Sequence, residues 1–142
     1  MRVCLDMGRE FVGVNGASDI LPFREIDAYH LLAGLIAGKD GALFVADDDG
    51  VLSGMVGASL ARCHWNRTKK VATELFWYVA PERRTGVGRA LMQALEDWAA
   101  GEGVNALGVM ALESQRPEAV AEVYRRRGYR PLERVFVKGI GV

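Results

Sequence analysis

The stretch Val71–Arg89, VATELFWYVAPERRTGVGR, contains a strand, a tight turn and the start of a helix. Its first part, Val71–Ala80, is rich in aromatic and β-branched residues, which favour a strand. The segment Arg83–Arg89 then carries Gly86 and Gly88 where a helical pattern begins. Glycines there let the backbone approach a ligand closely, and a helix start presents unpaired N–H groups. The segment is either a plain strand-to-helix turn or a binding site for an anion.

Two well-known phosphate-binding loops are excluded by pattern. The sequence lacks GxxxxGK[ST], and in GVGRAL the third glycine of the dinucleotide fingerprint is replaced by Leu91. Beyond the turn, apolar residues on one helical stripe predict a helix over Val87–Ala100. Three further elements are predicted downstream: a strand near Ala106–Leu112, a helix over Pro117–Arg127 and a final strand around Arg134–Val137.

Upstream of the central stretch, the spacing of apolar residues predicts a helix over Glu25–Ala37. Two strands, Ala42–Ala46 and Val51–Ala61, flank an Asp-Gly turn that favours a hairpin. Near the N-terminus, Arg2–Leu5 is interpreted as a short strand. Together these elements predict one domain spanning residues 1–142, of the α/β (α+β) class, with a mixed, mainly antiparallel central sheet flanked by helices.

Composition excludes several classes of protein. The 142 residues carry 18 Lys or Arg and 18 Asp or Glu, so the formal net charge is +0 and nothing draws the chain to nucleic acid or an anionic membrane. The sequence has only two cysteines, Cys4 and Cys63, and two histidines. These are too few, at unsuitable spacing, for a framework of disulfides or for a zinc site with cysteine and histidine ligands. We therefore expect that the protein binds no metal. No signal peptide or membrane span is evident, so we also expect a cytoplasmic protein.

The central stretch resembles the Gcn5-related N-acetyltransferase (GNAT) family, whose pyrophosphate-binding loop reads [RQ]-x-x-G-x-[GA]. Arg83, Gly86 and Gly88 match this loop. FWYVAPE before it is similar to the family's fourth strand, and RALMQALEDWA after it is similar to its third helix. Tyr124 begins YRRRGY, which matches the signature Tyr-x-x-x-Gly-[FY]. The resemblance covers roughly residues 42–138, with one residue fewer than usual between Pro81 and the loop arginine.

The resemblance implies that acetyl-coenzyme A (acetyl-CoA) is the cosubstrate. In this family the pantetheine arm inserts where the fourth and fifth strands separate and pairs with the edge of the fourth, here Trp77–Val79. The pyrophosphate then lies on the amides of Arg84–Arg89, with charge supplied by the loop arginines. The implied cofactor-binding residues are Trp77, Tyr78, Val79, Arg83, Arg84, Thr85, Gly86, Val87, Gly88 and Arg89.

Two side chains are candidates for the chemistry. Tyr124 matches the family tyrosine whose hydroxyl lies near the thioester sulfur, where a phenol can protonate the departing thiolate; the alternative is an ordinary core tyrosine. Glu74 is placed to accept the proton of the attacking amine, whose ordinary pKa is about 10.4; the alternatives are a solvent-facing strand residue, His64 or bulk water. Strict alternation places Glu74 on the same face as Phe76.

The resemblance implies an N-acetyltransferase in which a primary amine attacks acetyl-CoA directly in a ternary complex, without a covalent acyl-enzyme. The competing hypothesis is a non-catalytic module of the same fold that binds or senses acyl-CoA. Small amines, peptide N-termini and protein lysines all stay open as acceptors, and the final strand offers an edge for a homodimer. The run Arg125–Arg127 is interpreted as a helix end with acidic neighbours and not as a nucleic-acid patch.

Overall fold

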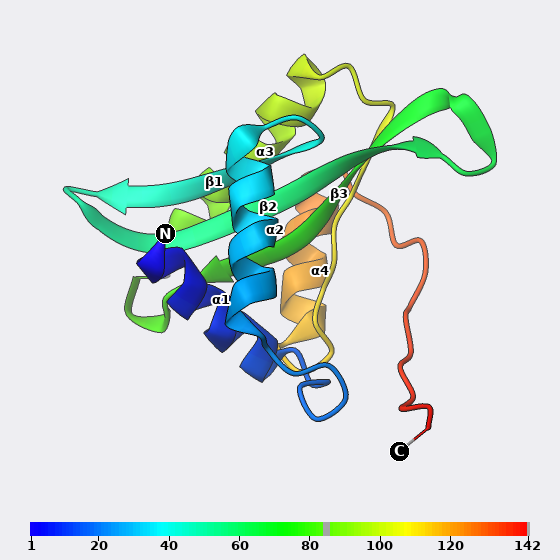
Figure 1. Ribbon diagram of the computed structural model, residues 1–142. Coiled ribbons are helices and arrows are strands. Elements are labelled where there is room, and N and C mark those ends of the chain that lie inside the picture. The colour runs from blue at the N-terminus through cyan, green and yellow to red at the C-terminus, as the bar shows by residue number, and fades with distance from the viewer. Residues whose placement is uncertain (84–85, 142) are drawn as a thin grey trace.

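The computed structural model describes residues 1–83 and 86–141, so Arg84 and Thr85 of the predicted loop lie outside the described residues. Within that part of the chain, helices and strands follow one another in a single unit (Figure 1). Their order is α1 (Arg2–Val14), α2 (Glu25–Ala37), β1 (Gly41–Asp48), β2 (Val51–Cys63), β3 (Asn66–Val79), a 3-10 turn (Pro81–Arg83), α3 (Val87–Gly101), β4 (Ala106–Gly108) and α4 (Pro117–Arg126).

The sheet has the order β1-β2-β3-β4, with β1, β2 and β3 antiparallel and β4 parallel to β3. The carboxylate of Asp47 stabilises the turn between β1 and β2, because it accepts a hydrogen bond of 2.7 Å from the main-chain N–H of Gly50. Asp49 and Gly50 both have positive φ there, as the Asp-Gly pair predicts. The predicted mixed, mainly antiparallel sheet is confirmed.

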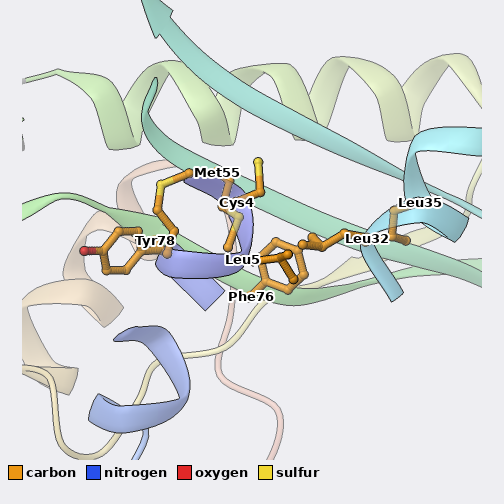
Figure 2. Close-up of a cluster of buried hydrophobic side chains, with 8 residues drawn as sticks. Cys4, Leu5, Leu32, Leu35, Met55, Phe76 and Tyr78 are labelled. Carbon is orange, nitrogen blue, oxygen red and sulfur yellow. The ribbon is translucent and has the colours of Figure 1, made fainter. Parts of the chain in front are cut away.

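Helices cover both faces of the sheet, and each face has its own apolar core (Figure 1). The first core lies between the sheet and α1 and α2, and Figure 2 shows its side chains. Its buried members are Cys4, Leu5, Met7, Leu32, Leu35, Met55, Phe76 and Tyr78. The second core lies on the opposite face, against α3 and α4, and its buried members are Val56, Ala58, Leu91, Met92, Leu95 and Tyr124. No helix among the described residues is long and apolar enough to cross a membrane.

The N-terminal strand predicted at Arg2–Leu5 is wrong, because this segment begins the helix α1. Apolar residues recur along α1 at spacings of three and four, and Cys4 and Leu5 are buried against the sheet. Gly8 and Gly13 interrupt this pattern in the sequence. A Cβ atom at Gly8 would be 3.5 Å from Cε2 of Phe23, an ordinary van der Waals distance, so packing does not require glycine at this position.

Two predicted strands also differ from the structure. The strand predicted near Ala106–Leu112 is limited to β4, which pairs with Val71–Thr73 before the following residues leave β3. The final strand predicted around Arg134–Val137 is wrong for the described chain, where these residues have no regular secondary structure. A strand needs a neighbour to satisfy its main-chain groups, and this segment pairs with no strand among the described residues.

Candidate active site

Glu74 lies beside an irregularity of β3 that decides which face its side chain occupies. In the register of β2 with β3, Gly57 pairs with Phe76 and the next residue, Ala58, pairs with Glu74. Leu75 is therefore an extra residue, and such a bulge reverses the alternation of side chains beyond it. Glu74 lies on the face of the second core together with Ala58, so the predicted sharing of a face with Phe76 is wrong.

The bulge brings Glu74 to the hydroxyl group of Tyr124. Tyr124 lies on α4, and its hydroxyl oxygen is 3.4 Å from Oε1 of Glu74. The same hydroxyl donates a hydrogen bond of 2.7 Å to the main-chain carbonyl of Met110, in the segment that follows β4. Tyr124 therefore bridges β3 and the segment after β4, close to where the two leave each other. The carbonyl of Met110 carries no side-chain signal, so sequence reasoning missed it.

Burial changes the acid–base properties of both groups. Glu74 is only 2% exposed, and the loss of water around it raises the pKa of its carboxyl group from 4.5 to about 7. Hydrogen bonds from Tyr124 and from the main chain of Met110 oppose this shift. Burial, and then the nearby charge of Glu74, raises the pKa of the Tyr124 phenol well above its ordinary range. A carboxyl group that titrates near neutral pH thus lies against a phenol that holds its proton.

The strand edge implied for cofactor binding lies directly beyond this pair. The parallel ladder of β3 with β4 ends at Thr73 and Gly108, whereas β3 continues to Val79. The side chains on this part of β3 are already engaged in packing. Trp77 packs in the second core, 5.9 Å from the ring of Tyr124 between centroids, and Tyr78 is buried in the first core with its hydroxyl on Glu10. Binding at this edge would therefore use main-chain groups.

Gly86, in the glycine loop, has a left-handed backbone that favours glycine. Gly86 is exposed, has a φ of +77° and is the N-cap residue of α3. It has no side chain, so the N–H groups of the first helical turn donate no hydrogen bond to a capping side chain. Packing favours glycine at position 88, because a Cβ atom there would be only 3.1 Å from Cζ2 of Trp77. Arg89 is exposed, whereas Arg83 pairs with Asp48 of the β1–β2 hairpin at 3.2 Å.

Other candidate residues are not brought to this place. His64 is exposed in the turn between β2 and β3, at the Cys63–Asn66 end of the hairpin and distant along the strand from Glu74. Both cysteines are free, Cys4 in the first core and Cys63 at the end of β2. In the described part of the chain no group of three or more His, Cys, Asp or Glu could hold a metal ion.

The arginine run at the end of α4 is tied to acidic neighbours. Arg126 pairs with Glu122 at 3.2 Å, four residues earlier. Arg127 is 18% exposed and bonds Glu96 of α3, which also accepts a hydrogen bond of 2.8 Å from Tyr129. The second core therefore ends in a polar cluster that joins α4 to α3.

This cluster gives a prediction about stability. Arg127→Ala is expected to lower the free energy of unfolding by about 1 to 2 kcal/mol, because Glu96 would keep a partly buried carboxylate without its guanidinium partner. The matched control is Arg126→Ala, whose ion pair with Glu122 is exposed and is expected to contribute no more than about 0.5 kcal/mol. Urea denaturation of the three proteins measures the difference; equal losses in both variants would show that burial of the pair is unimportant.

Comparisons with known proteins agree with this architecture. The family model described as the acetyltransferase (GNAT) family matches residues 13–129. No curated protein matches the chain. Among solved structures, an aminoglycoside acetyltransferase from an uncultured soil metagenomic sample has a TM-score of 0.69 and 19% identity, covering 99% of this chain and 91% of that one.

Two further structures are similar to the same degree. AAC(6')-Iy, solved in complex with the bisubstrate analog CoA-S-monomethyl-acetylneamine, has a TM-score of 0.68 and 20% identity, covering 96% of this chain and 91% of that one. An acetyltransferase from Trypanosoma brucei has a TM-score of 0.69 and 17% identity, covering 97% and 94%. At these identities the likeness shows a shared fold.

Proposed function

Because the chain belongs to the acetyltransferase (GNAT) family, we propose that it transfers an acetyl group from acetyl-CoA to a primary amine by direct attack. The observation that carries the proposal is the buried contact of Glu74 with Tyr124, at the place where β3 and the segment after β4 separate. An acyl transfer needs a group that takes a proton from the amine and a group that gives one to the thiolate. Glu74 can take up a proton near neutral pH, and Tyr124 carries a proton beside it.

The residues at the start of α3 fit the pyrophosphate of acetyl-CoA. Gly86 has a left-handed backbone with open space where a Cβ atom would be, so a phosphate oxygen can approach the N–H groups of the first helical turn. Arg89 is exposed and supplies positive charge to this loop, Arg83 shares its charge with Asp48, and Arg84 and Thr85 belong to the same proposed loop. The pantetheine arm would lie along the main chain of Trp77–Val79. Two complexes of AAC(6')-Iy, one with CoA and one with a CoA bisubstrate analog, support this choice of cosubstrate.

In the proposed reaction, Glu74 and Tyr124 move protons between the amine nitrogen and the sulfur of acetyl-CoA. The amine nitrogen bonds to the acetyl carbon while the carbon–sulfur bond breaks, and the electron pair leaves with sulfur. An amine that arrives as an ammonium group first loses one proton through Glu74 to solvent. During the attack the sulfur takes the proton of the Tyr124 hydroxyl, and the nitrogen releases a second proton through water to Glu74. Since Glu74 and Tyr124 are 3.4 Å apart, the proton on the carboxyl group can then return to the phenolate. Both side chains end the cycle as they began it.

We propose a small-molecule amine as the acceptor, since aminoglycoside acetyltransferases are among the structures that share the fold. The test is a CoA-release assay with acetyl-CoA and a panel of small amines, aminoglycosides, peptides with free N-termini and lysine peptides. Release of CoA above the rate of hydrolysis with a small amine is the expected result. Tight binding of acetyl-CoA without release for any acceptor would instead favour the non-catalytic module, and turnover of peptides alone would contradict the acceptor class.

The binding loop gives a second prediction. Gly86→Asp is expected to weaken acetyl-CoA binding by roughly 10- to 100-fold, because it places a negative charge beside the pyrophosphate. Gly86→Asn is the matched control, since Asn has nearly the same shape and also tolerates positive φ but carries no charge. Calorimetry on the folded proteins measures both affinities. Equal affinity for the Asp and Asn variants would place the pyrophosphate elsewhere.

A further inference from the structure

The β2–β3 hairpin extends beyond the rest of the sheet. β1 pairs with β2 only as far as Ser59, and β4 pairs with β3 only from Val71 onward. Between these limits, in the part of the chain that the structure describes, residues 61–69 have no neighbouring strand except their own hairpin partner. Figure 1 shows this end of the hairpin projecting away from the helices. We call residues 61–70 the hairpin tip.

The hairpin tip concentrates positive charge in a chain whose formal net charge is +0. No Asp or Glu occurs between Gly50 and Thr73, and the cations of the tip are Arg62, Arg67, Lys69 and Lys70. Lys70 pairs with Glu102 at 3.7 Å, whereas the other three are exposed and form no ion pair with any described residue. The acidic turn Asp47–Asp49 lies at the other end of β2, about 40 Å away along the strand, which is several times the screening length of salt. The local field at the tip is therefore positive.

The stability of the hairpin does not account for these side chains. Arg62 lies directly opposite Lys70 in the register of the two strands, and like charges in this position are destabilising. Trp65, in the turn, is 97% exposed, so its ring contributes almost no buried area to the fold. The turn itself is fixed, because Oδ1 of Asn66 accepts hydrogen bonds from the N–H of Thr68 at 3.1 Å and from its hydroxyl at 2.6 Å. A fixed turn thus presents a flat aromatic ring among unpaired cations.

This combination fits single-stranded nucleic acid better than other anionic partners. Proteins that bind single strands use cations for the phosphates and aromatic rings on which the bases stack. An acidic peptide segment would be recognised through the cations alone. An anionic membrane would favour several apolar groups at the tip, whereas Trp65 is followed by the polar residues Asn66, Arg67 and Thr68. Only a nucleic acid uses both the exposed ring and the charges.

We propose that the hairpin tip binds single-stranded RNA or DNA, with a base stacked on Trp65 and the neighbouring phosphates on Arg62, Arg67 and Lys69. This site is separate from the candidate active site, because Glu74 is eight residues along β3 from Asn66, roughly 25 Å. The hairpin would hold the protein on a nucleic acid while the Glu74–Tyr124 pair stays open to its own substrates. The net charge of the whole chain does not oppose this binding, because salt screens the distant acidic groups.

Fluorescence anisotropy tests the proposal with the full chain and labelled oligouridine and oligothymidine of about 12 nucleotides. At about 50 mM salt the wild type should bind with a Kd on the order of 10 μM, and the tighter of the two probes identifies RNA or DNA as the ligand. The logarithm of the affinity should fall with the logarithm of the salt concentration with a slope of about −2, the value for three phosphate contacts on a single strand. The assay contains no acetyl donor, so its outcome is independent of the proposed enzymatic activity.

Two variants separate stacking from charge. Trp65→Ala should weaken binding about tenfold and keep the salt dependence, because only the stacking is lost. The double variant Arg67→Glu with Lys69→Glu should weaken binding by about tenfold or more and make the slope less steep. The matched control is Arg130→Glu with Lys138→Glu, which makes the same change of charge at two other exposed cations and should leave the affinity unchanged. All five positions are exposed, so the melting temperatures should stay close to that of the wild type.

Tryptophan fluorescence gives a second readout. The oligonucleotide should quench the emission of the wild type but not that of Trp65→Ala, which keeps only Trp77 and Trp98. No binding at low salt would overturn the proposal, and so would an equal loss of affinity in the control variant. An oligoglutamate peptide that displaces the probe equally well would overturn it in favour of an acidic protein partner. Binding to phosphatidylserine vesicles without binding to either oligonucleotide would overturn it in favour of a membrane.

Discussion

Tyr124→Phe is expected to lower turnover by about 100-fold, the usual scale for the loss of a general acid, with little change in the affinity for acetyl-CoA. The phenylalanine keeps the ring contacts with Trp77 and Tyr129 and removes only the hydroxyl group. The departing thiolate would then lose its proton donor. The unpaired carbonyl of Met110 should also reduce stability by about 1 kcal/mol, a loss too small to account for the rate.

The control for this variant is Tyr129→Phe. Tyr129 packs against Tyr124 with ring centroids 5.5 Å apart, and its hydroxyl contacts Glu96 at the α3–α4 junction. Its removal should cost a similar amount of stability and leave turnover nearly unchanged. Steady-state kinetics at saturating acetyl-CoA, together with the melting temperatures, compare the two. If both variants lose turnover equally, Tyr124 is a packing residue.

Glu74→Gln is expected to make the protein more stable at pH 8 than the wild type. In the folded protein the pKa of Glu74 is raised from 4.5 to about 7 by burial, so the unfolded chain releases this proton first as the pH rises. The wild type should lose about 3 kcal/mol of unfolding free energy between roughly pH 4.5 and 7, where the two states bind different numbers of protons. Glutamine cannot ionise and escapes this loss. Denaturation across this pH range measures the difference, and Glu118→Gln, at an exposed carboxylate, should follow the wild type.

The same substitution should reduce activity while it increases stability. At neutral pH the Gln variant lacks a base for the amine, so turnover should fall, and it should recover in part as the pH approaches the amine's own pKa of about 10.4. The pH–rate profiles of both proteins with the same acceptor test this. Parallel profiles would remove Glu74 from the proton path and return the role to bulk water.

Local patterns in the sequence determined most of the secondary structure. The helices Glu25–Ala37, Val87–Gly101 and Pro117–Arg126 and the three-stranded meander follow from the spacing of apolar residues, which depends only on neighbours in the chain. The two errors at the ends of the chain have different causes. In α1 the glycines concealed a helical stripe, whereas Arg134–Val137 has the sequence pattern of a strand but no strand partner among the described residues.

The sequence by itself also singled out Glu74 and Tyr124, each from its position in a motif. Only the tertiary structure decided that the two side chains meet. The face of Glu74 depends on an extra residue in the pairing of two strands, and periodicity within one strand does not show this. The third partner is a main-chain carbonyl, which every residue type supplies equally. The raised pKa of Glu74 depends on water excluded by segments far apart in the chain, so it arises only when the second core is packed.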